Sequence, residues 1–172
     1  MAFSITRVTW REWLGLAAGL LALGTLFLPW TVLTAGAADA DVQNAFQALP
    51  RGDVVRSAWN SDPFSWLPPF VLVLIGLAVV GLGQIRKVRM SGLPQLWLVG
   101  SLATVLLMAI GWATLDWVFD SDQRAFLDAA GIAVGAGVGR YVGLLFALVS
   151  VVVAIFDMRA ARAESRASRR RR

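Results

Sequence analysis

A single arginine interrupts the last long apolar stretch of this chain. Arg140 is the only charged residue between positions 129 and 156. A charge at membrane depth is costly, so it marks either an ion or ligand site or an anchor whose long side chain reaches the membrane surface. We expect an anchor, because a helix that begins near Ala136 places Arg140 about one turn inside its outer end.

Acidic residues that can pair with Arg140 lie shortly before it in the sequence. Asp116 stands at the outer end of the preceding apolar stretch, and Asp120 and Asp128 follow in a short loop. An opposite charge within about 4–6 Å stabilises the charged form of a side chain. Arg140 and Asp116 are therefore the candidate anchor or site inside the membrane. Four further acids lie in a longer loop, where they are more often solvated than gathered around a cation: Asp39, Asp41, Asp53 and Asp62.

The sequence contains neither cysteine nor histidine. Their absence removes thiolate chemistry, disulfide bonds, and the commonest general base and metal ligand. No glycine-rich phosphate loop follows a strand pattern, since the glycines lie in apolar stretches. We therefore predict no catalytic residue, no metal site and no cofactor, and we expect that the protein is not an enzyme.

The elements that hold these residues are four long apolar segments. Hydrophobic residues make up 58% of the chain and charged residues 16%, against about 45–50% and 25% in soluble domains. A spanning helix needs about 17–25 apolar residues. The sequence thus predicts an all-α fold, a four-helix transmembrane bundle. Its membrane domain, residues 1–158, holds spans at about 13–34, 66–85, 93–115 and 137–157.

Charge predicts the orientation of these spans. Most of the 16 basic residues fall near the N-terminus, between the second and third spans, and in a basic tail at 159–172. The positive-inside bias then places both termini in the cytoplasm of a multi-pass plasma-membrane protein. Indole rings favour the membrane interface, and seven tryptophans fall near predicted span ends: Trp10, Trp13, Trp30, Trp66, Trp97, Trp112 and Trp117.

The first apolar segment has an alternative interpretation as a cleaved signal peptide. Arg7 and Arg11 precede it, and the small residues Ala35-Gly36-Ala37 follow it. The apolar core of a signal peptide is about 7–15 residues long. Because Leu14–Leu33 is longer, we expect an uncleaved span.

The first extracytoplasmic loop, residues 34–64, contains a short amphipathic pattern. Its apolar residues recur at helical spacing: Val42, Phe46 and Leu49. Asp39 or Asp41 can cap the start of this helix, and Pro50 lies beyond its end. We expect a loop helix that rests on the membrane or on the bundle's own outer mouth, and the alternative is a docking helix for an envelope partner.

Small residues form a continuous face on the last predicted span. They recur at steps of four and three: Gly131, Gly135, Gly139, Gly143, Ala147, Ser150 and Ala154. Such faces let membrane helices approach closely. The pattern predicts a helix-packing seam, expected inside the monomer, with a dimer or partner seam as the alternative. Weaker small-residue faces, proposed to meet it, occur on the first and third spans: Gly15, Ala18, Gly19, Ala22 and Thr25, then Ser101, Thr104, Met108 and Gly111.

The basic tail ends in four arginines: Arg169, Arg170, Arg171 and Arg172. Such a cluster favours anionic lipids or an acidic cytoplasmic partner, and the alternative is a topology determinant with a disordered end. We expect no nucleic-acid binding, because the tail lacks interleaved aromatic residues.

Three short motifs resemble a known group of proteins. They are Phe27-Leu28-Pro29-Trp30, Ser57-Ala58-Trp59, and the glycine-rich segment Gly137–Gly143. The chain is similar to small four-span membrane proteins of unknown function that are common in actinobacteria. The resemblance implies the four-span topology and no particular activity.

Two functions fit this sequence. We expect an interaction or accessory subunit of a cell-envelope or membrane complex, with a membrane-protein partner or a second copy of the chain. This follows from the close-packing face, the compact outer loop and the few chemically reactive groups. The alternative is a component of a small-solute or ion pathway, in which Arg140 and the outer aspartates line a mouth.

Overall fold

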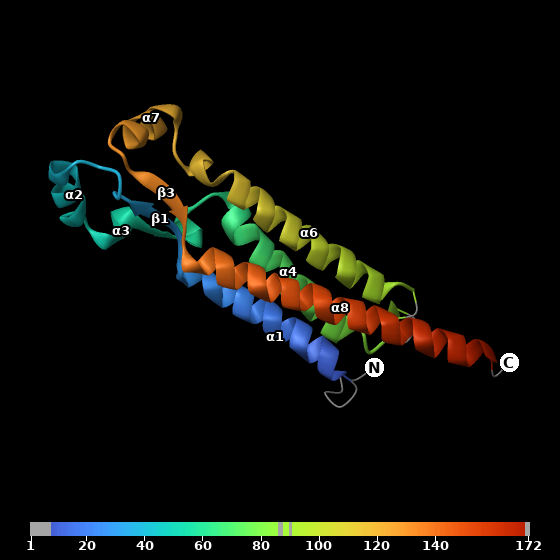
Figure 1. The fold of residues 1–172 in the computed structure, drawn as a ribbon. Helices are drawn as coiled ribbons and strands as arrows, with labels where there is room; N and C mark the ends of the chain where they lie inside the picture. Colours follow the sequence, from blue (N-terminus) through green and yellow to red (C-terminus); the bar gives the residue numbers. More distant parts are fainter. Residues whose placement is uncertain (1–7, 86–87, 90, 171–172) are drawn as a thin grey trace.

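Four long helices pack side by side into a bundle (Figure 1). They are α1 (Trp10–Gly24), α4 (Pro63–Leu82), α6 (Leu93–Ala113) and α8 (Val138–Arg170) in a computed structural model that describes residues 8–85, 88–89 and 91–170. Helix α1 packs mainly on α4 and α8, and α6 packs on the same two helices. Each helix therefore has two principal neighbours.

Three of the four helices are long and apolar enough to cross a membrane. They are α4, α6 and the Val138–Glu164 part of α8. These correspond to the predicted second, third and fourth spans, although α8 continues as helix to Arg170. Helix α1 has only 15 residues, so by length and composition the membrane-spanning character holds for three helices.

The predicted first span, at about 13–34, is wrong in its second half. After α1 the chain makes a 3₁₀ turn, η2 (Thr25–Phe27), and then the strand β1 (Pro29–Thr34). Proline disfavours helical backbone in the residue before it and lacks a donor for the helix ladder. Leu28 is accordingly extended, with ψ 166°, and the β-branched residues that follow favour a strand.

A small sheet at one end of the bundle, the end expected to face outward, corrects the expectation of a purely helical protein. Strand β1 lies between β2 (Val55–Ser57) and β3 (Ala133–Ala136), and both pairings are antiparallel. In the second pairing Val32 faces Gly135. Strand β3 lies immediately before α8, so the sheet joins the start of the last helix to the end of the first helical segment.

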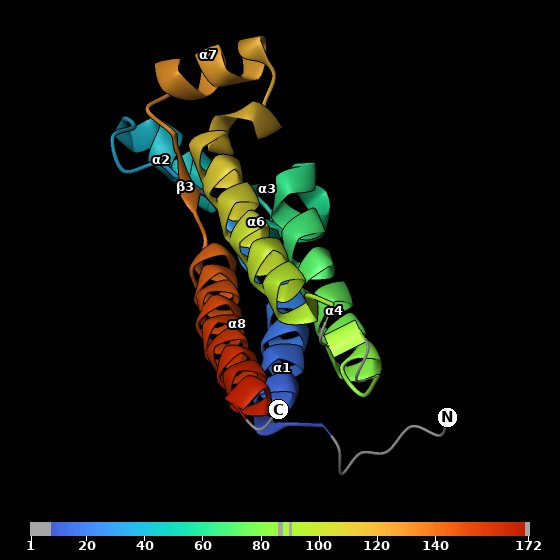
Figure 2. The same cartoon turned by 90° about the vertical axis from the view of Figure 1, so that its right-hand side faces the viewer.

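Short helices complete this outer cap, which we define as residues 29–62 and 115–137. The predicted loop helix is present as α2 (Ala40–Gln47), with Asp39 at its N-cap position. The others are α3 (Arg51–Val54), η3 (Ala58–Asn60), η4 (Leu115–Val118) and α7 (Ser121–Ala129). Figure 2 shows α7 at the far outer end, beyond the sheet.

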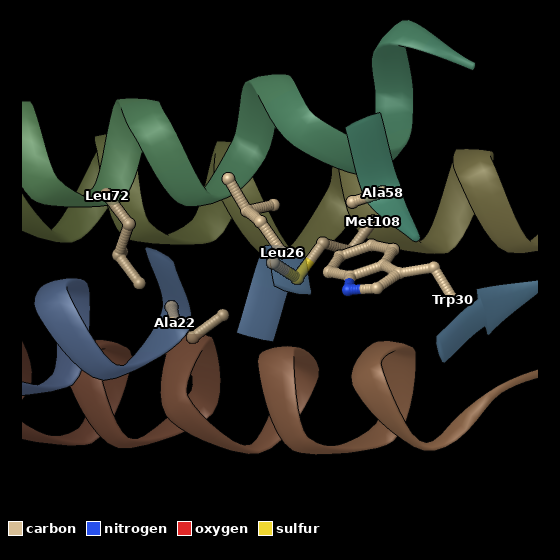
Figure 3. Close-up of a cluster of buried hydrophobic side chains, with 7 residues drawn as sticks. Ala22, Leu26, Trp30, Ala58, Leu72 and Met108 are labelled. Atoms are coloured by element: carbon tan, nitrogen blue, oxygen red, sulfur yellow. The ribbon is translucent and has the colours of Figure 1, made fainter. Parts of the chain in front are cut away.

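The core lies where the bundle meets the cap (Figure 3). Leu26, Trp30, Leu72 and Met108 form it with three buried alanines, and a second cluster surrounds Trp97 deeper in the bundle. Trp30 and Trp97 are almost fully buried, so these two indole rings pack against the protein itself. Indole rings fill these positions because small residues on the facing helices leave room for them.

The small faces of α1 and α6 turn into the bundle, as predicted. Gly15, Ala18, Gly19 and Ala22 are buried on α1. A Cβ on Gly19 would lie 3.1 Å from the backbone oxygen of Leu72. Helices α1 and α4 therefore pack with their backbones close together, as small residues permit.

Candidate functional site

The Arg140 centre, which we define as Arg140 with Asp62, Ser65 and the carbonyl groups of Trp30 and Gly111, lies at the outer end of the bundle. Arg140 donates from Nε to the Trp30 oxygen at 2.9 Å and from Nη1 to the Gly111 oxygen at 2.6 Å. Its Nη2 donates to Asp62 Oδ2 at 3.3 Å and to Ser65 Oγ at 3.1 Å. One side chain therefore joins β1, α6, the start of α4 and the start of α8.

Local structure supplies each acceptor. Gly111 lies in the last turn of α6, where carbonyl groups have no partner within the helix. The Trp30 oxygen also accepts from the backbone nitrogen of Gly137 at 3.0 Å. Trp30 is itself held by its indole nitrogen, which donates to the Thr25 oxygen at 2.6 Å. The guanidinium carbon lies 5.7 Å from the centroid of the Trp30 ring, a distance at which a cation–π interaction is favourable.

Asp62 is the described acidic partner of Arg140, and neither Asp120 nor Asp128 contacts it among the described side chains. Asp62 stands at the N-cap position of α4, and its Oδ2 also accepts from Ser65 Oγ at 2.9 Å. Asp120 instead caps α7 by accepting from the Gln123 backbone nitrogen at 2.7 Å, and the side chain of Asp116 lies outside the described residues. The acid that the structure places beside Arg140 thus comes from the first loop, which precedes α4.

Arg140 is buried in protein, so the expectation that its side chain reaches the membrane surface is wrong. The residue is 4% exposed and Ser65 is fully buried. A guanidinium keeps its charge and has no acceptor, so this group binds and orients but does not move protons. One atom of the centre remains unsatisfied, since Asp62 Oδ1 is buried without a hydrogen-bond partner among the described residues.

The predicted small-residue seam is only partly helical. Gly131 lies in a turn, at φ +67°, and Gly135 lies in β3, so a helical face through these two is wrong. Both precede α8 because this segment pairs with β1 rather than continuing the helix. Gly139, Gly143 and Ala147 do lie on α8.

The helical part of the seam contacts the chain's own first segment. A Cβ on Gly139 would overlap the Trp30 indole, and one on Gly143 would lie 3.1 Å from Thr25 Oγ1. Ala147 is fully buried in the core. This face is therefore packed inside the monomer, the expected one of the two alternatives.

Two further polar groups lie deeper in the bundle. Ser150 of α8 accepts from the Trp97 indole nitrogen at 3.2 Å and lies 3.0 Å from Ser101 Oγ. At the opposite end from the cap, Asp157 Oδ1 accepts from Arg11 Nε at 3.0 Å and lies 3.9 Å from Arg89 Nη2. Neither set of contacts was expected from the sequence. The two serines were interpreted only as small residues on packing faces, and the charged residues only as signals of orientation.

Two grooves flank α7 in the outer cap. One has a volume of about 600 Å³ and lies between α7 and β3, with Arg124, Asp128 and Val134 among its lining residues. The other has a volume of about 340 Å³ and is lined by Arg56, Phe119 and Phe126, among others. The guanidinium of Arg56 lies over the Phe119 ring, 4.8 Å from its centroid.

The predicted basic tail lies partly outside the described residues. The side chains of Arg169 and Arg170, and all of Arg171 and Arg172, are outside the described residues. Within the described ranges, no three acidic side chains gather closely enough to hold a metal ion. No protein-family model matches the chain, and no curated protein or solved structure matches it either.

Proposed function

We propose that this protein is an accessory subunit of a cell-envelope complex, which binds a partner protein outside the membrane through the α7 side of its cap. The supporting observation is α7 itself. Among its nine residues none is buried, although it presents Phe126 and Leu127. Phe126 is 69% exposed beside the Arg56–Phe119 groove. Exposed apolar surface rimmed by polar side chains is typical of protein–protein binding sites.

Helix α7 has a well-formed N-terminal cap. Asp120 and Gln123 form a reciprocal capping box at its start, which satisfies two backbone donors that a helix end otherwise leaves free. The apolar side chains on α7 are therefore presented on an ordered element. A preorganised surface binds with a smaller entropy cost than a disordered loop.

The same proposal includes four membrane spans with both termini in the cytoplasm of a plasma-membrane protein. Helix α1 and the η2 turn together have a length of about 28 Å, close to the ~30 Å of a bilayer core. The distribution of basic residues supports this orientation. The exposed arginines on the last turns of α8 agree with this orientation, because they favour anionic lipids at the cytoplasmic surface.

Small-solute or ion transport has less support. The centre of the bundle is filled by large side chains, including Trp30, Leu72 and Trp97. The donors of Arg140 contact four groups of the protein. A pathway through the monomer would have to displace these contacts.

The test is purification of the full chain from its native membrane in mild detergent, with Phe126→Asp as the variant. We expect a partner protein at a fixed stoichiometry with the native chain and its loss from Phe126→Asp. Thermal unfolding should be unchanged, because Phe126 contributes little to the fold. Asn44→Asp, which adds the same charge on the exposed surface of α2, is the matched control and should retain the partner.

Two results contradict the proposal. One is a chain that purifies alone and conducts ions or transports a solute in liposomes. The other is a partner retained equally by the native chain and Phe126→Asp, which would place the binding surface away from α7.

A further inference from the structure

A groove with no polar lining runs along the outside of the bundle between α1 and α8, near the end opposite the cap. Its volume is about 380 Å³, and its lining residues include Trp10, Leu14, Leu148, Val152 and Phe156. The neighbouring Val153 is almost fully buried and forms the floor. An apolar chain binds more favourably in such a groove than on a smooth helix face, because the groove offers van der Waals contacts on several sides.

A cationic centre adjoins this groove at the same end of the bundle. Trp10 and Phe156 of the groove precede Arg11 and Asp157 in the chain. The guanidinium carbon of Arg11 lies 5.9 Å from the centroid of the Trp10 ring. Arg11 and Arg89 both approach Asp157 Oδ1, at 3.0 and 3.9 Å.

This centre has donors with no hydrogen-bond partner among the described residues. The bond to Asp157 occupies one of the five N–H groups of Arg11. Arg89 Nε is buried with no hydrogen-bond partner among the described residues. Glu12, the other acid nearby in the chain, accepts from the Thr9 backbone nitrogen at 2.7 Å in a capping box. Two arginines therefore share one carboxylate. Arg89 Nε is shielded from an external anion, but the Arg11 and Arg89 side chains are 19% and 22% exposed, so their terminal N–H groups can reach one.

We propose that the groove and the cationic centre together bind one anionic phospholipid. An acyl chain lies in the groove between α1 and α8, and the phosphate lies against Arg11 and Arg89. A phospholipid joins an apolar chain to an anion, as this site joins a groove to two arginines. Arginine forms strong charge-assisted hydrogen bonds with phosphate oxygens. The proposal depends on the bundle being in a membrane and is independent of the partner proposed for α7.

The experiment is native mass spectrometry of the full chain in mild detergent, titrated with phosphatidylglycerol or with phosphatidylcholine of the same acyl chains. We expect one phosphatidylglycerol to bind about fivefold more tightly than phosphatidylcholine, as expected for one favourable charge contact. Leu148→Trp and Val152→Trp each fill the groove and should remove this site for both lipids. Arg11→Gln and Arg89→Gln should remove the preference between the headgroups.

Matched controls separate the site from general effects. Leu106→Trp, on the exposed face of α6, and Arg124→Gln, on α7, should bind lipid as the native chain does. Replacing the last four arginines by glutamine should also leave the site intact. Arg11→Gln could fail to fold because Asp157 loses its partner. In that case the double variant Arg11→Gln/Asp157→Asn, which removes both charges, is used in place of the single variant.

Three outcomes overturn the proposal. Equal affinity for the two lipids would remove the headgroup contact. Unchanged binding in both groove-filling variants, at native thermal stability, would remove the acyl-chain site. A dimer in the native chain that Leu148→Trp dissociates would show that a second copy fills the groove instead.

Discussion

Arg140 Nη2 and Asp62 Oδ2 lie 3.3 Å apart in a buried ion pair whose members are separated by 78 positions in the chain. The pair joins the first turn of α8 to the N-cap of α4. Because Arg140 also binds the carbonyl groups of Trp30 and Gly111, it connects the cap to three of the four bundle helices: α4, α6 and α8.

Arg140→Met should destabilise the protein strongly. It leaves the Asp62 charge buried without its partner, and removing one member of a buried pair costs about 3–5 kcal/mol. For a chain of this size we expect the thermal midpoint in detergent to fall by roughly 6–12 °C or more. Arg124→Met, on exposed α7, should change little. A native midpoint for Arg140→Met would show that the pair contributes nothing to stability.

The double variant Arg140→Met/Asp62→Leu should recover part of the stability that Arg140→Met loses. It removes both charges, and an apolar replacement of a buried pair is often close to neutral. Thermal unfolding of the two single variants and the double variant gives the coupling between the two sites. Strictly additive losses would mean that the two residues act independently.

Gly139→Ala should be more harmful than Gly143→Ala. A Cβ at 139 overlaps the Trp30 ring, whereas one at 143 lies 3.1 Å from a hydroxyl group that can shift. Overpacking costs about 1–3 kcal/mol, while alanine gains up to about 1 kcal/mol of helix propensity. Gly81→Ala is the matched control, because no atom lies within 4 Å of its added Cβ, and it should be neutral or stabilising. Equal stabilities for the 139 and 143 variants would contradict close packing on Trp30.

Ser150→Ala should cost about 1 kcal/mol, because it leaves the Trp97 indole nitrogen without its acceptor and Ser101 without its partner. Thermal unfolding in detergent measures this loss. Ser91→Ala, in an exposed turn, is the control. A shift no larger than that of the control would indicate that these polar contacts do not stabilise the bundle.

The proposed orientation is tested by single cysteines, since the native chain has none. Cysteine at the exposed positions Ser121 or Asn44 should react with an impermeant thiol reagent in intact cells. Cysteine at Ser91, between α4 and α6, should react only after the membrane is opened. The reverse labelling pattern would invert the topology.

Apolar length and small-residue spacing predicted the bundle, because both reflect the packing of whole helices. They do not report short strands. Strand β3 has four residues, three of them glycine or alanine, and it forms because β1 offers an edge, not because of its own propensity. Pro29 was the one local signal that the first helix ends early.

The partner of Arg140 was missed for a related reason. Asp62 is far from Arg140 in the sequence and resembles the other loop acids in composition. Its role follows from the up-and-down order of the four helices, in which α4 and α8 run in the same direction and their starts lie beside each other. The sequence did identify Arg140 as a candidate anchor or site, because a charged residue within a long apolar stretch is costly at membrane depth.

Because α8 is one uninterrupted helix to Arg170, its length sets the distance between the bundle and the arginines near its end. From Asp157 to Arg170 the helix advances about 20 Å. A flexible tail of the same length would let its arginines sample a broad volume. A continuous helix sets the positions of Arg159, Arg162 and Arg166 around and along its axis, so a binding partner at this end meets them at one spacing. Adding or deleting a single residue there would rotate every later arginine by about 100°, which makes the tail sensitive to register as well as to charge.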